Sequence, residues 1–162
     1  MLENKKTKAI AKAVAFTGHR RVHHREMVAE RLKEAVLQSY KNGTTIYYSG
    51  MALGFDMLAA EVILSLKASL PLLKLIAVVP FRGQSASWPI AEQQCYARIL
   101  SQADEVIFLS EDYFNGCYLR RNDYMLSHSD NVIAYYDSKP MGGTAYTCRK
   151  AREKRMDIVN VF

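Results

Sequence analysis

Short apolar runs alternate with amphipathic stretches along almost the whole chain. The apolar runs predict six β-strands, at residues 13–17, 45–48, 73–80, 105–110, 131–137 and 157–162. The amphipathic stretches predict five helices, at residues 25–41, 55–67, 90–102, 119–128 and 143 to about 155. Such alternation is typical of a parallel sheet covered on both faces. We therefore expect an α/β fold: a three-layer, Rossmann-like, doubly wound and mainly parallel sheet, with strand order 3-2-1-4-5 plus a C-terminal strand.

The composition is that of an ordinary globular protein, with 49% hydrophobic and 23% charged residues. A length of 162 residues suits one domain. We expect that domain at residues 13–162, after a basic, flexible N-terminal tail at residues 1–12 that contains four lysines. No apolar run is long enough to cross a membrane, and the N-terminus does not resemble a signal peptide. The three cysteines are far apart and show no metal-ligand spacing, which favours a cytoplasmic protein.

The net charge of +6 is compatible with a polyanionic partner. Much of it comes from the tail and from a basic cluster at residues 149–155, and we favour two solvated basic segments as the explanation. Nucleic acid is therefore the less favoured partner.

Glycine, hydroxyl and arginine residues follow several of the predicted strands. The first strand leads into Gly18, His19 and Arg20; the second into Ser49, Gly50, Met51, Gly54 and Asp56; the fifth into Asp137, Gly142, Gly143 and Thr144. In doubly wound sheets, ligands bind outside the carboxyl ends of the strands, where these loops meet. Glycine lets backbone N–H groups approach a phosphate, and a helix N-terminus such as that expected after Gly142 attracts an anion. The loops therefore predict a site for a phosphate-bearing ligand.

Other patterns point away from several common functions. There is no G-x-G-x-x-G fingerprint, no Walker A lysine and no Gly-x-Ser-x-Gly elbow. His19, His23 and His24 have no carboxylate at ligand spacing, so we expect no metal site. Asp56, at the start of a helix, fits an N-cap better than a catalytic acid.

Several segments, in the same order along the chain, resemble the YpsA-like family of bacterial proteins. They are Phe16-Thr17-Gly18-His19-Arg20, residues 49–56 with Ala59-Ala60-Glu61, residues 121–125 with Ser129-Asp130, and Tyr136-Asp137 with Gly142-Gly143-Thr144. Together they extend over nearly the whole chain. The resemblance implies membership of the SLOG group of Rossmann-like proteins, which bind nucleotide-derived ligands, and it alone suggests a homodimer through the outer helices.

Two relatives within that group are similar over shorter segments. Residues 49–56 look like the Ser-Gly-x-Ala-x-Gly-x-Asp signature of DprA, a recombination mediator that binds single-stranded DNA. Residues 121–125, Ser129-Asp130 and residues 142–144 are similar to the LOG phosphoribohydrolases, which cleave the N-glycosidic bond of a nucleoside monophosphate with an arginine and a glutamate. Arg121 occupies the place of that arginine. The glutamate is missing, because Ala145-Tyr146-Thr147-Cys148 follows Thr144.

Three functions remain open at this point. We favour a sensor or regulatory module that binds an ADP-ribose-like, NAD-like or nucleoside-phosphate ligand and signals to an unidentified protein partner. The alternatives are a phosphoribohydrolase, with Arg121, Glu61 and Asp137 as catalytic candidates, and DprA-like binding of single-stranded DNA. Whether the chain is an enzyme is left open.

For the favoured function, each part of the site has an expected role. Gly142, Gly143 and Thr144 hold a phosphate, and Ser49, Gly50, Met51, Gly54 and Asp56 form a second wall. Gly18, His19 and Arg20 close over the ligand, and Arg121 and Asn122 reach it from the fourth helix. Asp137 or Glu61 binds a ribose hydroxyl.

Overall fold

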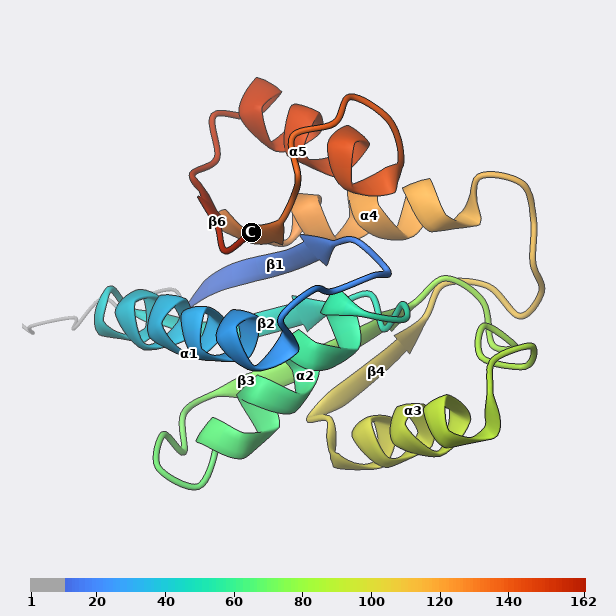
Figure 1. Ribbon diagram of the computed structural model, residues 1–162, viewed down its shortest axis with the longest axis horizontal. Coiled ribbons are helices and arrows are strands. Elements are labelled where there is room, and N and C mark those ends of the chain that lie inside the picture. The colour runs from blue at the N-terminus through green and yellow to red at the C-terminus, as the bar shows by residue number, and fades with distance from the viewer. Residues whose placement is uncertain (1–10) are drawn as a thin grey trace, which may run out of the picture.

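The computed structural model describes residues 11–162, and its elements follow the predicted alternation (Figure 1). The strands are β1 (Lys12–Gly18), β2 (Thr44–Ser49), β3 (Lys74–Val79), β4 (Glu105–Phe108), β5 (Asn131–Tyr135) and β6 (Ile158–Asn160). The helices are α1 (Arg25–Lys41), α2 (Phe55–Leu66), α3 (Ile90–Gln102), α4 (Cys117–Ser127) and α5 (Gly143–Glu153). All but the last two residues of the expected basic tail lie outside the described residues.

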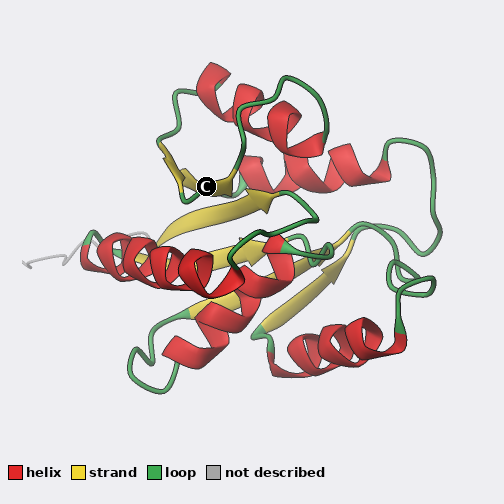
Figure 2. Ribbon diagram, viewed as in Figure 1, coloured by secondary structure: helices red, strands yellow, loops and turns green. Residues whose placement is uncertain are grey.

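The strands form one six-stranded sheet in the order β4-β3-β2-β1-β5-β6, and every neighbouring pair is parallel. Helices cover both faces of this sheet (Figure 2). The predicted three-layer, Rossmann-like α/β fold is therefore confirmed.

The predicted strand order was wrong in one respect: the fourth strand does not lie beside β1. It pairs with β3 at the edge of the sheet, and β5 takes the place beside β1. The burial of the strands agrees with the observed order. Five of the six residues of β3 are buried, as an interior strand requires, whereas those of β4 are only half-buried or exposed. The strands β1, β2, β3 and β4 are thus added one after another toward one edge of the sheet. After β4 the direction of strand addition reverses, and β5 and β6 are added on the other side of β1.

This reversal distributes the helices between the two faces. α1, α2 and α3 follow the strands added in one direction, and they pack on one face with Phe16, Tyr47 and Leu75 of the sheet. After β4 the chain crosses back, so α4 and α5 pack on the opposite face, over Ala15 and Ala134. Right-handed crossovers require this change of face when the direction of strand addition changes.

The same reversal sets the position of the site. β1 leads to α1 on one face and β5 leads to α5 on the other, although the two strands are neighbours. Their following loops diverge and leave a crevice at the carboxyl ends of the strands, which is where ligands bind in open α/β sheets.

Candidate functional site

A cleft of about 540 Å³ lies at the carboxyl ends of the strands. Eight of the thirteen residues expected to bind a ligand line it: Gly18, His19, Arg20, Asp56, Arg121, Asn122, Gly143 and Thr144. The other five, Ser49, Gly50, Met51, Gly54 and Gly142, do not line it. Eight further residues line the cleft that were not among the thirteen expected binding residues: Phe16, Thr17, Ala52, Tyr113, Asn115, Gly116, Tyr118 and Leu119.

The loop after β1 is held between β5 and the start of α2. The His19 N–H donates to the Tyr135 carbonyl (3.3 Å), and the His19 carbonyl accepts from the Phe55 N–H (3.2 Å). The His19 Nε2 accepts from the Asp137 N–H (3.1 Å). A Cβ atom at Gly18 would overlap the Phe55 ring, so glycine is needed for this close approach. These contacts fix the loop that forms one side of the cleft.

The loop after β2 lies beneath the cleft lining, and Ala52 is its residue that reaches the cleft. Met51 is fully buried in a left-handed conformation (φ 58°), and its N–H donates to the Ser49 Oγ (3.2 Å). The Gln84 Nε2 donates to the Met51 carbonyl at 2.6 Å, from the segment after β3. Gly54 has a φ of 85°, and a Cβ atom there would overlap the backbone of Arg20. The residues of this loop that were expected to touch a ligand thus support the lining residues instead.

Asp56 lies in the first turn of α2, with only 5% of its surface exposed. Gly54 occupies the N-cap position. Within the described part of the chain, the Asp56 carboxyl group accepts only from the Ala52 N–H, which precedes the helix, so the N-cap prediction was wrong. Its Oδ2 accepts from the Ala52 N–H (3.3 Å), whereas its Oδ1 has no partner. Burial raises the pKa of this carboxyl to about 6, although the charges of Arg121 and Arg20 and the Ala52 hydrogen bond favour the ionised form.

Arg121 on α4 is equally buried, at 5% exposure. Its Nη1 donates to the Gly50 carbonyl (2.6 Å) and its Nε to the Asn122 Oδ1 (2.8 Å). Burial lowers the pKa of the guanidinium, and the nearby Asp56 opposes that shift. A guanidinium has five N–H donors, so Arg121 keeps donors for a ligand after these two bonds. A Cβ atom at Gly50 would lie 2.7 Å from the arginine Nε, which explains the glycine there.

The N-terminus of α5 forms another part of the lining. Gly142 is the N-cap residue, with a φ of 101°, and as a glycine it has no side chain to cap the first N–H groups of the helix. Gly143 and Thr144 begin the helix and line the cleft. The first N–H groups of a helix have no partner within it, so this end can donate to an anion. A Cβ atom at Gly143 would meet only the Asn122 Nδ2, at an ordinary 3.7 Å.

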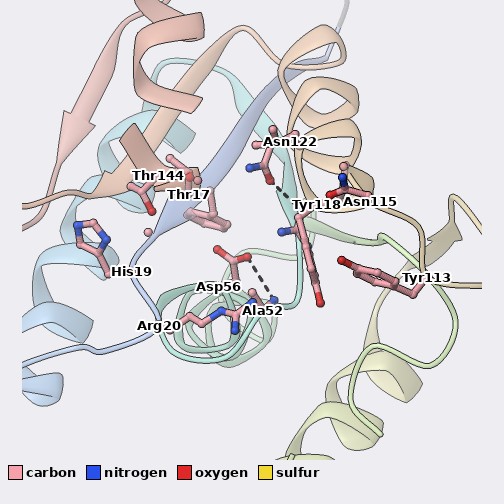
Figure 3. A pocket seen from close by; sticks show the side chains of 16 residues that line it. Thr17, His19, Arg20, Ala52, Asp56, Tyr113, Asn115, Tyr118, Asn122 and Thr144 are labelled. Atoms are coloured by element: carbon pink, nitrogen blue, oxygen red, sulfur yellow. Dashed lines mark hydrogen bonds between the residues drawn. The ribbon is translucent and has the colours of Figure 1, made fainter. Parts of the chain in front are cut away.

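Aromatic rings form the opposite side of the cleft. Tyr118 and Tyr113 lie together with ring centroids 6.3 Å apart, and Phe81 contacts both rings edge-on. The Arg20 guanidinium lies 5.8 Å from the Tyr118 ring centroid. Figure 3 shows Asp56 between these tyrosines on one side and Thr17 and Thr144 on the other. The aromatic residues around Gly116, shortly after the fourth strand, were the sequence signal for this wall.

Two acidic residues proposed from sequence take other positions. Glu61 does not line the cleft, because its Oε1 pairs with Arg98 (2.7 Å) and its Oε2 with Arg25 (3.4 Å) on neighbouring helices. Glu61 therefore joins α2 to the neighbouring helices through two ion pairs outside the cleft. Asp137 lies at the edge, with its Oδ1 3.1 Å from the His19 Nε2. The hydrogen bond from the Lys139 N–H is the main reason that the pKa of Asp137 lies below its ordinary value, and desolvation opposes this shift.

Within residues 11–162, no three His, Cys, Asp or Glu side chains gather in a metal-binding arrangement, and the three cysteines of this range are free thiols. None of the helices described here has both the length and the apolar character needed to cross a bilayer.

The fold and cleft define a Rossmann-like protein with a site at the topological switch point. The family profile described as the YspA SLOG family matches residues 16–160, and the chain belongs to this family. A UPF0398 protein of Shouchella clausii is 30% identical over 138 residues, which cover 83% of this chain and 71% of the relative. A UPF0398 protein of Brevibacillus brevis is 32% identical over 104 residues, covering 63% of this chain and 55% of that relative.

Two solved structures are similar over 91% of this chain. One is DNA processing protein A from Helicobacter pylori, with a TM-score of 0.64 and 25% identity, and its description concerns single-stranded DNA binding. The chain spans 63% of that protein. The other is TM1055, with a TM-score of 0.56 and 15% identity over 72% of its length, a likeness that shows the fold alone.

Proposed function

We propose that this cleft binds a nucleotide-derived, phosphate-bearing small molecule, and that the protein acts as a sensor or regulatory module. An ADP-ribose-like, NAD-like or nucleoside-phosphate ligand fits this description. The observation that supports the proposal most is the convergence, in one cleft, of a helix N-terminus, a buried arginine and a buried carboxyl group at the switch point. The volume of about 540 Å³ is also within the usual range for small-molecule sites.

The phosphate is assigned to the N-terminus of α5. Gly143 and Thr144 offer backbone N–H groups, and Thr144 adds a hydroxyl donor. Arg121 provides a positive charge at the same cleft and is held in place by Gly50 and Asn122. Because its charge is largely removed from water, its interaction with an anion is screened less than it would be at the surface.

The test is a thermal-shift and calorimetric screen against nucleoside mono- and diphosphates, NAD and ADP-ribose. A ligand at about 100 times its dissociation constant should stabilise the fold by about 2.7 kcal/mol. Gly143→Val should reduce its affinity at least tenfold without unfolding the protein, since a Cβ atom there makes only one ordinary contact. Gly83→Val is the matched control, because Gly83 also accepts a Cβ atom and does not line this cleft.

No shift with any compound, or an equal affinity in the Gly143 variant, would contradict the proposal. Release of a free base from a bound nucleotide would instead support the hydrolase alternative. Asp56 is the carboxyl group within the cleft lining that such a reaction could use.

Single-stranded DNA binding is a second candidate, supported by the likeness to DNA processing protein A. Exposed aromatic side chains also lie beside arginines at this end of the molecule. Tyr113 is 60% exposed, and the Arg120 guanidinium lies 5.7 Å from the Phe114 ring centroid. Aromatic and basic side chains together are typical of single-strand binding surfaces. A fluorescent oligothymidine titrated at two salt concentrations tests this candidate, because phosphate contacts make DNA affinity fall steeply with salt.

A further inference from the structure

The Asp56 carboxyl group is the feature of the cleft that the phosphate site does not explain. It is buried and lines the cleft, and its single hydrogen bond is a long one of 3.3 Å from the Ala52 N–H. Its Oδ1 has no hydrogen-bond partner. A buried polar atom without a partner is rare and calls for an explanation, and one explanation is a ligand that provides the missing donor.

The neighbouring arginines do not satisfy this carboxyl group. Arg121 donates its Nη1 and Nε to Gly50 and Asn122. Arg20 lies against the Tyr118 ring. Both arginines act on Asp56 through their charge, but no hydrogen bond from either to Asp56 is present among the described residues. The group is therefore an acceptor with an unused oxygen at the cleft wall. Because Oδ1 is itself buried, the carboxyl group must rotate about its Cβ–Cγ bond to turn this oxygen toward a ligand.

The position of Asp56 limits what it can bind. An ionised carboxylate only accepts hydrogen bonds and repels a phosphate, so the phosphate must lie elsewhere in the cleft. Figure 3 shows Asp56 between Thr144, at the start of α5, and the ring of Tyr118. In a nucleoside 5′-phosphate the ribose likewise lies between the phosphate and the base.

We propose that Asp56 accepts hydrogen bonds from the ribose hydroxyls of the ligand, with the phosphate at the N-terminus of α5 and the base against Tyr118. This inference rests on the proposed function and makes it more specific. It assigns to Asp56 the role that the sequence analysis gave to Asp137 or Glu61. It also defines the ligand class: a ribonucleotide with free 2′- and 3′-hydroxyl groups.

The test compares the adenosine, guanosine, cytidine and uridine 5′-monophosphates with their 2′,3′-dideoxy counterparts by calorimetry. The wild-type protein should bind at least one ribonucleotide roughly 10- to 100-fold more tightly than its dideoxy form, the range expected for hydrogen bonds to a charged group. Asp56→Asn should remove most of this preference by weakening ribonucleotide binding. Asp130→Asn is the matched control, because Asp130 also accepts a backbone N–H (Ala13, 2.8 Å) but is not part of the cleft lining, so the preference should persist.

The outcomes separate this inference from the proposed function. Binding that depends on Gly143 but is equal for the ribo and dideoxy forms, or a preference unchanged in Asp56→Asn, would overturn the role of Asp56 alone. Absence of binding to all eight compounds would overturn the role of Asp56 in nucleoside monophosphates. The wider screen with NAD and ADP-ribose would then decide the proposed function. The wild-type comparison needs no variant, so a folding defect in Asp56→Asn would not prevent the test.

Discussion

The burial of Asp56 has a consequence for stability that can be measured without any ligand. Its pKa is about 6 in the folded protein, against an ordinary value of 3.8. Each pKa unit corresponds to about 1.4 kcal/mol, so ionised Asp56 lowers the free energy of unfolding by about 3 kcal/mol relative to the protonated form. The folded state holds its proton to a higher pH than the unfolded state does. The contribution of Asp56 is therefore most favourable below about pH 4, declines between about pH 4 and 6, and stays low above that range.

Asp56→Asn removes this titration while nearly preserving the shape of the side chain. The free energy of unfolding of the variant, relative to wild type, should rise by about 2.5 kcal/mol between pH 4 and pH 7.5. The two proteins also differ in their free energy of unfolding by an amount that does not depend on pH. The asparagine NH₂ group takes the place of an unpaired oxygen, and an unsatisfied buried donor costs about 1–3 kcal/mol. This constant amount does not affect the change with pH, and titrations common to both proteins, such as that of Asp104, cancel in the difference.

The assay is urea unfolding of both proteins at pH 4.0, 5.0, 6.0 and 7.5, analysed with a common slope. In thermal unfolding the same change corresponds to roughly 2–4 °C per kcal/mol for a chain of this size. Parallel stability curves for the two proteins would refute the reasoning, since they would mean that Asp56 titrates alike in the folded and unfolded states.

The other stability predictions concern the loops that support the cleft. Gly54→Ala should lower the free energy of unfolding by more than about 2 kcal/mol, because φ is 85° and the new Cβ atom would overlap the backbone of Arg20. Gly43→Ala, with a φ of 96° in open space, should cost only about 1 kcal/mol, and equal losses in urea unfolding would contradict the overlap. Gln84→Leu leaves the buried Met51 carbonyl without its 2.6 Å donor and should cost about 1–3 kcal/mol; an unchanged urea midpoint would show that this bond is not needed.

The fold class followed from sequence because β-strand and helix periodicities are local properties. The alternation of apolar strands and amphipathic helices was sufficient for a covered parallel sheet, and for a site at the carboxyl ends of the strands. The order of the strands was not accessible in the same way, since β4 beside β3 and β4 beside β1 give the same local pattern. β4 is only partly buried because it lies at the edge of the sheet, and this burial exists only once the sheet has assembled.

Residues of the candidate site could be predicted where the residue type and its place at a helix start indicate a role. They could not be predicted where the role of a side chain depends on contacts with distant parts of the chain. Gly143 and Thr144 were identified because glycine and a hydroxyl at a helix start favour anion binding. Asp56 was expected in the second wall of the site but was interpreted as an N-cap. Its actual hydrogen bond and its burial depend on how α2 meets the loop after β2, which the local sequence does not show. Gln84 was not identified at all, because its amide contacts Met51, 33 residues earlier in the chain.

The role of Asp56 also bears on the choice between the two candidate functions. Within a DNA strand the sugar has no 2′-hydroxyl, and its 3′-oxygen belongs to the next phosphate. A DNA sugar placed against Asp56 would therefore offer this carboxylate no donor and would bring phosphate charge close to it. A mononucleotide with free hydroxyls avoids both penalties. A strong ribose preference that disappears in Asp56→Asn would thus favour the small-ligand function. Tight oligothymidine binding that improves in Asp56→Asn would indicate that single-stranded DNA occupies the cleft and that the carboxylate opposes it.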